Sequence, residues 1–232
     1  MTRNIQTELT NWARILSSYN LCSDVSPITG EIGGVRRNNI YHIQKLKIGP
    51  FNPPRNTIPN DVNTIYVLLD IKFKPLDLAI TDIDNNIEEY LFNVTFIGEG
   101  NGEQKYYSSF HLDYDKSDEA KVIHPWFHFT YGGHSLKGYN TGNVLFLSAP
   151  RLPFLPMDFF LGIDFIISNF LNKEDYYKIS GNSLYKNALK NSQNSVWKQY
   201  ILSIAHHWCK FSGCEYNIKN ENLCKHFIPT LI

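Results

Sequence analysis

In EYLFNVTFIGEGNGEQKYYSSFHLDY, residues 89–114, two segments of alternating side chains flank a short glycine-rich link. Alternation with a period of two is typical of β-strands that bury one face and expose the other. The link, Glu99-Gly100-Asn101-Gly102, is polar and short enough to join two antiparallel neighbours. This stretch therefore predicts a β-hairpin and, with it, an antiparallel sheet.

Segments on both sides of this hairpin continue the strand pattern. Residues 63–73, 124–131 and 144–148 are strand-like, and a shorter apolar run lies at residues 40–43. Residues 24–60 are otherwise rich in Ser, Pro, Gly and Asn. Within them, GPFNPP at residues 49–54 predicts a loop, because proline removes a backbone donor and fixes φ.

Helical spacing of apolar residues precedes and follows the strands. Residues 5–19 predict an amphipathic helix with Leu9 and Trp12 on its apolar face. Residues 157–171 are apolar on nearly all sides and predict a buried helix opened by Pro156. The order helix, strands, helices predicts one α+β domain over residues 1–232. We expect an antiparallel sheet of about five or more strands, flanked by an N-terminal helix and C-terminal helices.

The C-terminal third is expected to hold two more helices. One covers residues 183–190, and a last long helix begins near Asn194 or Ser195. The apolar face of this last helix should comprise Trp197, Ile201, Ile204 and Trp208.

Composition limits the classes of function and the compartment. Hydrophobic residues make up 43% of the chain and charged residues 19%, which is enough to bury a core. Lys plus Arg and Asp plus Glu are each 22, so no global charge attracts nucleic acid or an anionic membrane. A local basic patch stays open. We expect no secretory signal, no membrane span and reduced cysteines, and hence a cytoplasmic protein.

Polar residues gather on one side of two strand-like segments. Alternation places His111 and Asp113 opposite the aromatic side of residues 109–114. It places His124 and His128, together with Trp126 and Thr130, opposite the aromatic side of residues 124–131. If both aromatic sides face the core, these polar residues share one surface of a hairpin.

Imidazoles beside a carboxylate are suited to acid–base catalysis, and also to binding a transition metal. We therefore take His111, Asp113, His124 and His128 as candidate catalytic residues. Two alternatives stay open, namely a solvated polar face without a function and a metal site. The metal, and any other cofactor, is unknown.

Two nearby segments are candidates for ligand binding. Gly132 and Gly133, followed by His134, permit positive φ or close approach of a ligand to the backbone, although a flexible hairpin loop explains them equally. Arg151 follows Pro150 and is suited to gripping a carboxylate or phosphate of a ligand. The alternative for Arg151 is an internal ion pair with an aspartate of residues 157–171.

A zinc site is conceivable near the C-terminus, where the possible ligands are Cys209, Cys214, Cys224 and His226. Structural zinc sites usually have paired ligands two to four residues apart at both ends, and this spacing does not provide them. Reduced thiols that are packed or exposed are the alternative.

The chain resembles a family of uncharacterised bacterial proteins that carry a domain of unknown function. The resemblance lies in the run 124–128, HPWFH, in Gly132-Gly133, in Pro150-Arg151-Leu152-Pro153 and in Pro156-Met157-Asp158. It implies a setting in mobile or anti-phage defence loci. It implies no established activity, and no catalytic role is carried over.

Two hypotheses about function follow. The first is an accessory or effector protein of a bacterial defence or toxin-type locus, which binds a partner protein from the same locus, nucleic acid or a nucleotide. The second is a small hydrolase or nuclease that uses the His/Asp surface, with Arg151 holding a phosphate.

Overall fold

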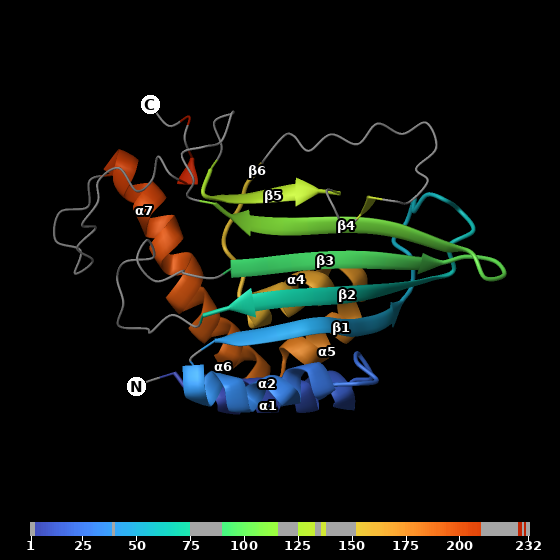
Figure 1. Cartoon of the computed structure of the whole chain (residues 1–232), viewed down its shortest axis with the longest axis horizontal. Coiled ribbons are helices and arrows are strands. Elements are labelled where there is room, and N and C mark those ends of the chain that lie inside the picture. Colours follow the sequence, from blue (N-terminus) through green and yellow to red (C-terminus); the bar gives the residue numbers. More distant parts are fainter. Residues whose placement is uncertain are drawn as a thin grey trace.

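A six-stranded antiparallel sheet, with its strands in chain order, forms the framework of the protein (Figure 1). The computed structural model describes residues 3–38, 40–74, 90–115, 125–132, 136–137, 152–209, 227–228 and 230. The strands are β1 (Tyr41–Phe51), β2 (Thr64–Phe73), β3 (Tyr90–Glu99), β4 (Lys105–Tyr114), β5 (Phe127–Tyr131) and β6 (Leu152–Pro153). The predicted α+β class and the hairpin of residues 89–114 are confirmed, since β3 and β4 pair directly.

Helices lie along one edge and behind one face of this sheet (Figure 1). They are α1 (Ile5–Ser18), α2 (Ser26–Asn38), α4 (Phe159–Phe170), α5 (Lys173–Ser180), α6 (Ser183–Ser192), the π-helical turn η2 (Gln193–Trp197) and α7 (Lys198–Cys209). The pair α1 and α2 borders the edge strand β1, and α4 and α5 lie behind the sheet (Figure 1). No helix within the described residues is long and apolar enough to cross a membrane.

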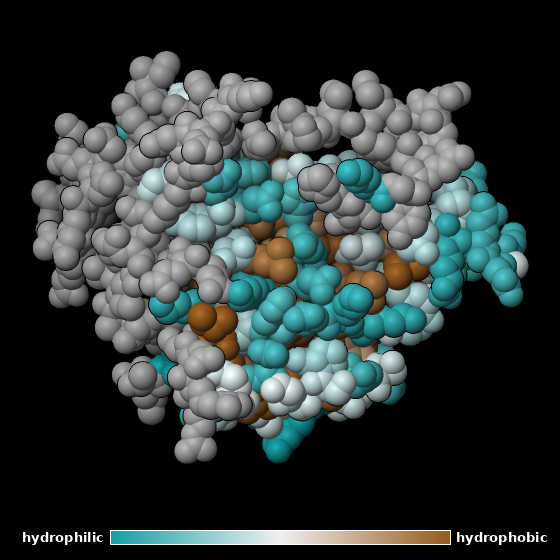
Figure 2. Space-filling model, in the orientation of Figure 1, coloured by the Kyte–Doolittle hydropathy of each residue, from teal (hydrophilic) through white to brown (hydrophobic). Residues whose placement is uncertain are grey.

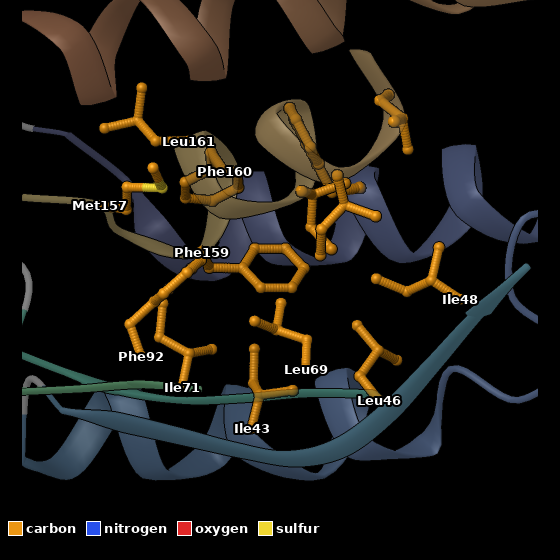
Figure 3. Packing of buried hydrophobic residues seen from close by; sticks show 14 of the residues in the cluster. Ile43, Leu46, Ile48, Leu69, Ile71, Phe92, Met157, Phe159, Phe160 and Leu161 are labelled. Carbon is orange, nitrogen blue, oxygen red and sulfur yellow. The ribbon is translucent and has the colours of Figure 1, made fainter. Parts of the chain in front are cut away.

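The core lies between the inner face of the sheet and α4. Alternate residues of β2 and β3, such as Leu69, Ile71 and Phe92, are fully buried. Figure 3 shows Phe159 of α4 reaching toward these strand residues, and Phe160 packs against Trp12 of α1. Since seven residues of α4 are buried, the prediction of a buried helix in this stretch is confirmed.

The start of α4 differs from the prediction. Asp158, rather than Pro156, opens the helix, because its carboxylate accepts a hydrogen bond from Leu161 N at 3.0 Å. The backbone N–H of Phe159, which has no acceptor within the first turn of the helix, donates a hydrogen bond to the Tyr41 hydroxyl at 2.9 Å.

Neither aspartate of α4 is shown paired with Arg151, which lies outside the described residues. Asp158 pairs with Arg3, and Asp164 accepts hydrogen bonds from the hydroxyls of Tyr176 at 3.0 Å and Tyr185 at 2.5 Å. Among the described residues, Asp164 is therefore satisfied by neutral donors.

Three segments of the chain depart from the sequence-based expectation, two of them helical and one a strand. The residues between 24 and 38 form α2, which Asp24 caps by accepting a bond from Ser26 N at 2.8 Å. Strand β1 runs on through Gly49 and Pro50 to Phe51, where a loop was expected. In the last helix, α6 continues through η2 into α7, so neither Asn194 nor Ser195 begins a helix.

The expected apolar face of α7 is only partly buried. Ile201 and Trp208 are exposed, whereas Tyr200 and Ser203 of the same helix are buried. The buried side of this helix follows Val196, Tyr200 and Ser203 instead, so the stripe of larger apolar side chains lies beside the core-facing side. The expected strand at residues 144–148 lies outside the described residues.

Gly162 of α4 packs directly against the ring of Phe92, which is fully buried. We expect Gly162→Ala to lower the free energy of unfolding by about 1–3 kcal/mol, because the added methyl group overlaps a ring that cannot move aside. The overlap should cost more than the gain of about 1 kcal/mol in helix propensity that alanine has over glycine, so the substitution should be destabilising. Urea unfolding measures the difference.

Gly30 of α2 is the matched control. It is exposed, and a Cβ there would meet no atom within 4 Å. Gly30→Ala should therefore stabilise the protein by up to about 1 kcal/mol. Equal effects of the two substitutions would contradict the close packing between α4 and β3.

Candidate functional site

The polar surface predicted from alternation lies on the outer face of β4 and β5, away from α4. Asp113 lies opposite His128, and His111 lies opposite Thr130 in the antiparallel register. The predicted common face is therefore confirmed for His111, Asp113 and His128. His124, Gly133, His134 and Arg151 lie outside the described residues, and their predicted roles remain predictions.

Both imidazoles turn the same nitrogen toward one carboxylate oxygen. His111 Nε2 lies 3.0 Å from Asp113 Oδ2, a hydrogen bond, and His128 Nε2 lies 3.6 Å from it. The longer distance is an electrostatic contact rather than a hydrogen bond. The Asp113 side chain is 44% exposed, against 18% for His111 and 4% for His128. Solvent and a ligand therefore reach the carboxylate and the His111 ring.

His128 is held from both sides by acceptors. Its Nδ1 lies 3.0 Å from the Pro125 carbonyl oxygen, and its Nε2 faces Asp113. A carbonyl and a carboxylate only accept hydrogen bonds, so a doubly protonated ring suits both neighbours. In a neutral ring, one of the two nitrogens carries a lone pair, which would face the Pro125 carbonyl oxygen or the Asp113 carboxylate. His128 is thus held between two acceptors, which fix the orientation of its ring beside the carboxylate.

The electrostatics of Asp113 result from two opposing effects. Burial alone would raise the pKa of its carboxyl group. The hydrogen bond from His111 and the nearby His128 ring outweigh burial and hold this pKa well below its usual range. Asp113 is therefore a carboxylate at neutral pH. Its bond to His111 Nε2 leaves Nδ1 of that ring to exchange protons with a ligand.

The depressed pKa of Asp113 predicts a pH effect on stability. The pKa of this carboxyl in the folded state lies below the value of about 3.9 that an ordinary aspartate has, so its stabilising contribution is present above that pH and is lost as pH falls toward the folded pKa. We expect wild type to exceed Asp113→Asn in unfolding free energy at pH 5 by about 1 kcal/mol or less, because the side chain is solvent-screened.

This advantage should shrink as the pH falls below 4, and urea titrations of both proteins at several pH values measure it. In a ¹³C titration of the wild type, the Asp113 carboxyl should stay ionised at pH values where ordinary aspartates are half protonated. A titration midpoint near about 3.9, the pKa of an ordinary aspartate, would contradict the proposed pairing.

Two buried hydroxyls accompany this cluster. Ser109 is fully buried and Thr130 is 6% exposed, and neither hydroxyl has a hydrogen-bond partner in the part of the chain that the structure describes. An unsatisfied buried polar group costs about 1–3 kcal/mol. Ser109 was not predicted, although it precedes His111 by two residues and so shares its face. That parity could have identified it.

The structure changes the expected start of β5 and explains one glycine. The strand begins at Phe127, and Trp126 packs with Tyr114 and Phe227 instead of sharing the polar face. Gly132 has a φ of +79°, and its N–H donates to Ser109 O at 2.7 Å. Glycine suits this position because the chain turns there in a left-handed conformation.

The metal hypothesis gains no support from the geometry. Within the described ranges there is no group of three or more His, Cys, Asp or Glu side chains that could hold a metal ion. The suggested zinc ligands Cys214, Cys224 and His226 lie outside those ranges, as does the side chain of Cys209. The described free cysteine, Cys22, is buried, and burial raises the pKa of its thiol to about 12.

Comparison of the chain with protein-family models, with curated proteins and with solved structures finds no match.

Proposed function

We propose that the protein is a small hydrolase in which His111, oriented by Asp113, acts as a general base. The observation that carries this proposal is the 3.0 Å hydrogen bond between His111 Nε2 and a carboxylate that is itself partly open to solvent. A carboxylate that holds one imidazole nitrogen fixes the ring's orientation and stabilises the imidazolium that forms during proton transfer.

Each group has a distinct part in the proposed reaction. His111 Nδ1 takes a proton from a water molecule as the water oxygen attacks the phosphorus or carbonyl carbon of the ester. The bond from that atom to the leaving oxygen then breaks, and the protonated His111 gives its proton to the leaving alcohol. Asp113 stabilises the proton gained by His111. His128, with both nitrogens facing acceptors, holds Asp113 in place. Its low exposure supports a positioning role rather than direct contact with substrate.

A serine nucleophile is disfavoured. Ser109 shares the face of His111 and Asp113, but within the described residues its hydroxyl has no hydrogen-bond partner and so no bond to His111. An activated serine requires a neighbouring base within hydrogen-bond reach. Direct attack by water therefore suits this arrangement better.

The test is a screen with generic substrates. Purified protein is incubated with bis(p-nitrophenyl) phosphate, p-nitrophenyl phosphate, p-nitrophenyl acetate and labelled oligonucleotides, and Asp113→Ala serves as the blank for contaminating enzymes. We expect turnover of at least one substrate by the wild type alone. Equal rates for wild type and the blank on every substrate would contradict the proposal.

A second candidate function is binding of a partner protein, as expected for an accessory or effector protein of a bacterial defence or toxin-type locus. The supporting observation is the outer face of β2 and β3, where Leu68, Leu91 and Ile97 are only partly buried. Figure 2 shows apolar atoms between hydrophilic ones on this side of the molecule. Partly exposed apolar residues within a polar surround are typical of protein interfaces.

Co-expression with the products of neighbouring genes tests this second candidate. A partner that uses this face should elute with the wild type on gel filtration and separate from Leu91→Glu, because the charge would be buried without a pair. Lys45→Glu is the control, because Lys45 is an exposed residue of the edge strand β1. Retention of the partner by Leu91→Glu would exclude this face.

A further inference from the structure

From the two buried hydroxyls beside His111 we infer a binding subsite for a phosphate oxyanion, formed by Ser109, Thr130 and His111. This inference rests on the proposed hydrolase and names its substrate class as phosphoesters. It places the phosphoryl oxygens on the side of His111 away from Asp113.

The first step of the argument is that the hydroxyls need a partner. Ser109 is fully buried and Thr130 nearly so, and within the described residues both lack a hydrogen bond. Buried polar side chains in proteins are almost always satisfied, so an orphaned pair at one place indicates a missing ligand or water. Their common place on one sheet face indicates a single shared partner.

The second step is that the two hydroxyls and His111 surround one point on the sheet. Thr130 lies directly opposite His111, and Ser109 precedes His111 by two residues on the same face. Opposed residues in such a pair have Cβ atoms about 5 Å apart, and neighbours on one face of a strand are about 7 Å apart. A group the size of phosphate can therefore contact all three side chains.

The third step concerns charge. Both hydroxyls can donate hydrogen bonds, and Nδ1 of His111 becomes a donor when the ring is protonated. Asp113, the nearby anion, already receives His111 Nε2 and faces His128, so its charge is compensated on the other side of the ring. A cation would instead favour Asp113, and an apolar ligand would leave the hydroxyls unpaired.

Inorganic phosphate tests the subsite without any catalytic step. Its titration into ¹⁵N-labelled protein in phosphate- and sulfate-free buffer should shift the backbone amides of Ser109, His111 and Thr130 to saturation. Ser109→Ala and Thr130→Val should each weaken binding by about tenfold, the usual effect of one hydrogen bond to a charged group. Thr64→Val, on the same face at the far end of β2, should bind as the wild type does.

Stability separates a binding role from a structural one. Removal of an unsatisfied hydroxyl should leave the melting temperature of Thr130→Val unchanged or raised. Unsaturable shifts, or wild-type affinity in both hydroxyl variants, would overturn the inference and would show that water alone occupies the site. Phosphate binding without turnover of any substrate would keep the subsite and overturn the hydrolase. Turnover that neither Ser109→Ala nor Thr130→Val changes would keep the hydrolase and overturn the subsite.

Discussion

Replacement of Arg3 by methionine is expected to lower the free energy of unfolding by about 3–5 kcal/mol, the largest stability effect that we predict. The Arg3 and Asp158 side chains are 3% and 2% exposed, and Arg3 Nη2 lies 3.3 Å from Asp158 Oδ2. Removal of the guanidinium leaves Asp158 as an uncompensated charge in the core, which is the costly way to break a buried pair.

The guanidinium also joins parts of the chain that are distant in sequence. It donates to Ser192 Oγ at 2.6 Å and to Ser195 Oγ at 3.0 Å, on either side of the start of η2, and to Glu8 of α1 at 2.8 Å. Ser192 in turn donates to Asp158 at 2.6 Å. Arg3 therefore links α1, the first turn of α4 and the π-helical turn in one network.

Lys178→Met is the matched control, because Lys178 pairs with Glu174 and Asp175 on the exposed surface of α5. It should leave the free energy of unfolding nearly unchanged, because solvent screens an exposed ion pair. The double variant Arg3→Met/Asp158→Asn should regain part of the loss, since the second change removes the stranded charge. Denaturant unfolding of all four proteins measures these differences. A loss below about 1 kcal/mol in Arg3→Met would show that the network is dispensable.

The strands could be predicted because each of them has one buried face. In β2, β3 and β4, alternation alone predicts correctly which residues face the core and which face outward. It also places His111 and Asp113 correctly on the same face as His128. The parity of a strand is set by its buried side, so a one-residue error would turn Tyr106, Phe110 and Tyr114 of β4 outward. This is why three of the four candidate catalytic residues could be brought together without coordinates.

The helices that were missed or misplaced depend on capping and packing. Helix α2 has glycines at 30, 33 and 34, which lower its helix propensity, yet Asp24 caps its first turn and Glu31 accepts a bond from His42 N of β1 at 2.9 Å. Tertiary contacts thus outweigh local preference. The π-helical turn η2, which joins α6 to α7 without a break, has no comparable sequence signal, so the start of the last helix was misplaced.

The partner of Asp158 was beyond prediction for a different reason. Arg151 is close in sequence and follows a proline, whereas Arg3 precedes Asp158 by 155 residues. Spacing along a chain ranks nearby partners first, but burial of a charged pair is decided by which elements meet in the core. Only the position of α1 beside α4 and α6 makes Arg3 the partner.

His111→Ala is expected to reduce kcat by about 10²–10⁴-fold on any phosphoester that the wild type turns over, because that is the usual contribution of a general base. The free energy of unfolding should change by only about 0.5 kcal/mol, because the ring is partly exposed and its hydrogen-bond partner Asp113 can turn to solvent.

His128→Ala provides the contrast within the same cluster. Its ring is 4% exposed and bonded to the Pro125 carbonyl, so the substitution should lower the free energy of unfolding by about 1–3 kcal/mol as well as affecting activity. Steady-state kinetics and thermal melts on both variants separate the two roles. A wild-type kcat in His111→Ala would show that His111 is not the general base. Unfolding of His111→Ala would make it a structural residue, and the outer face of β4 would then serve stability rather than chemistry.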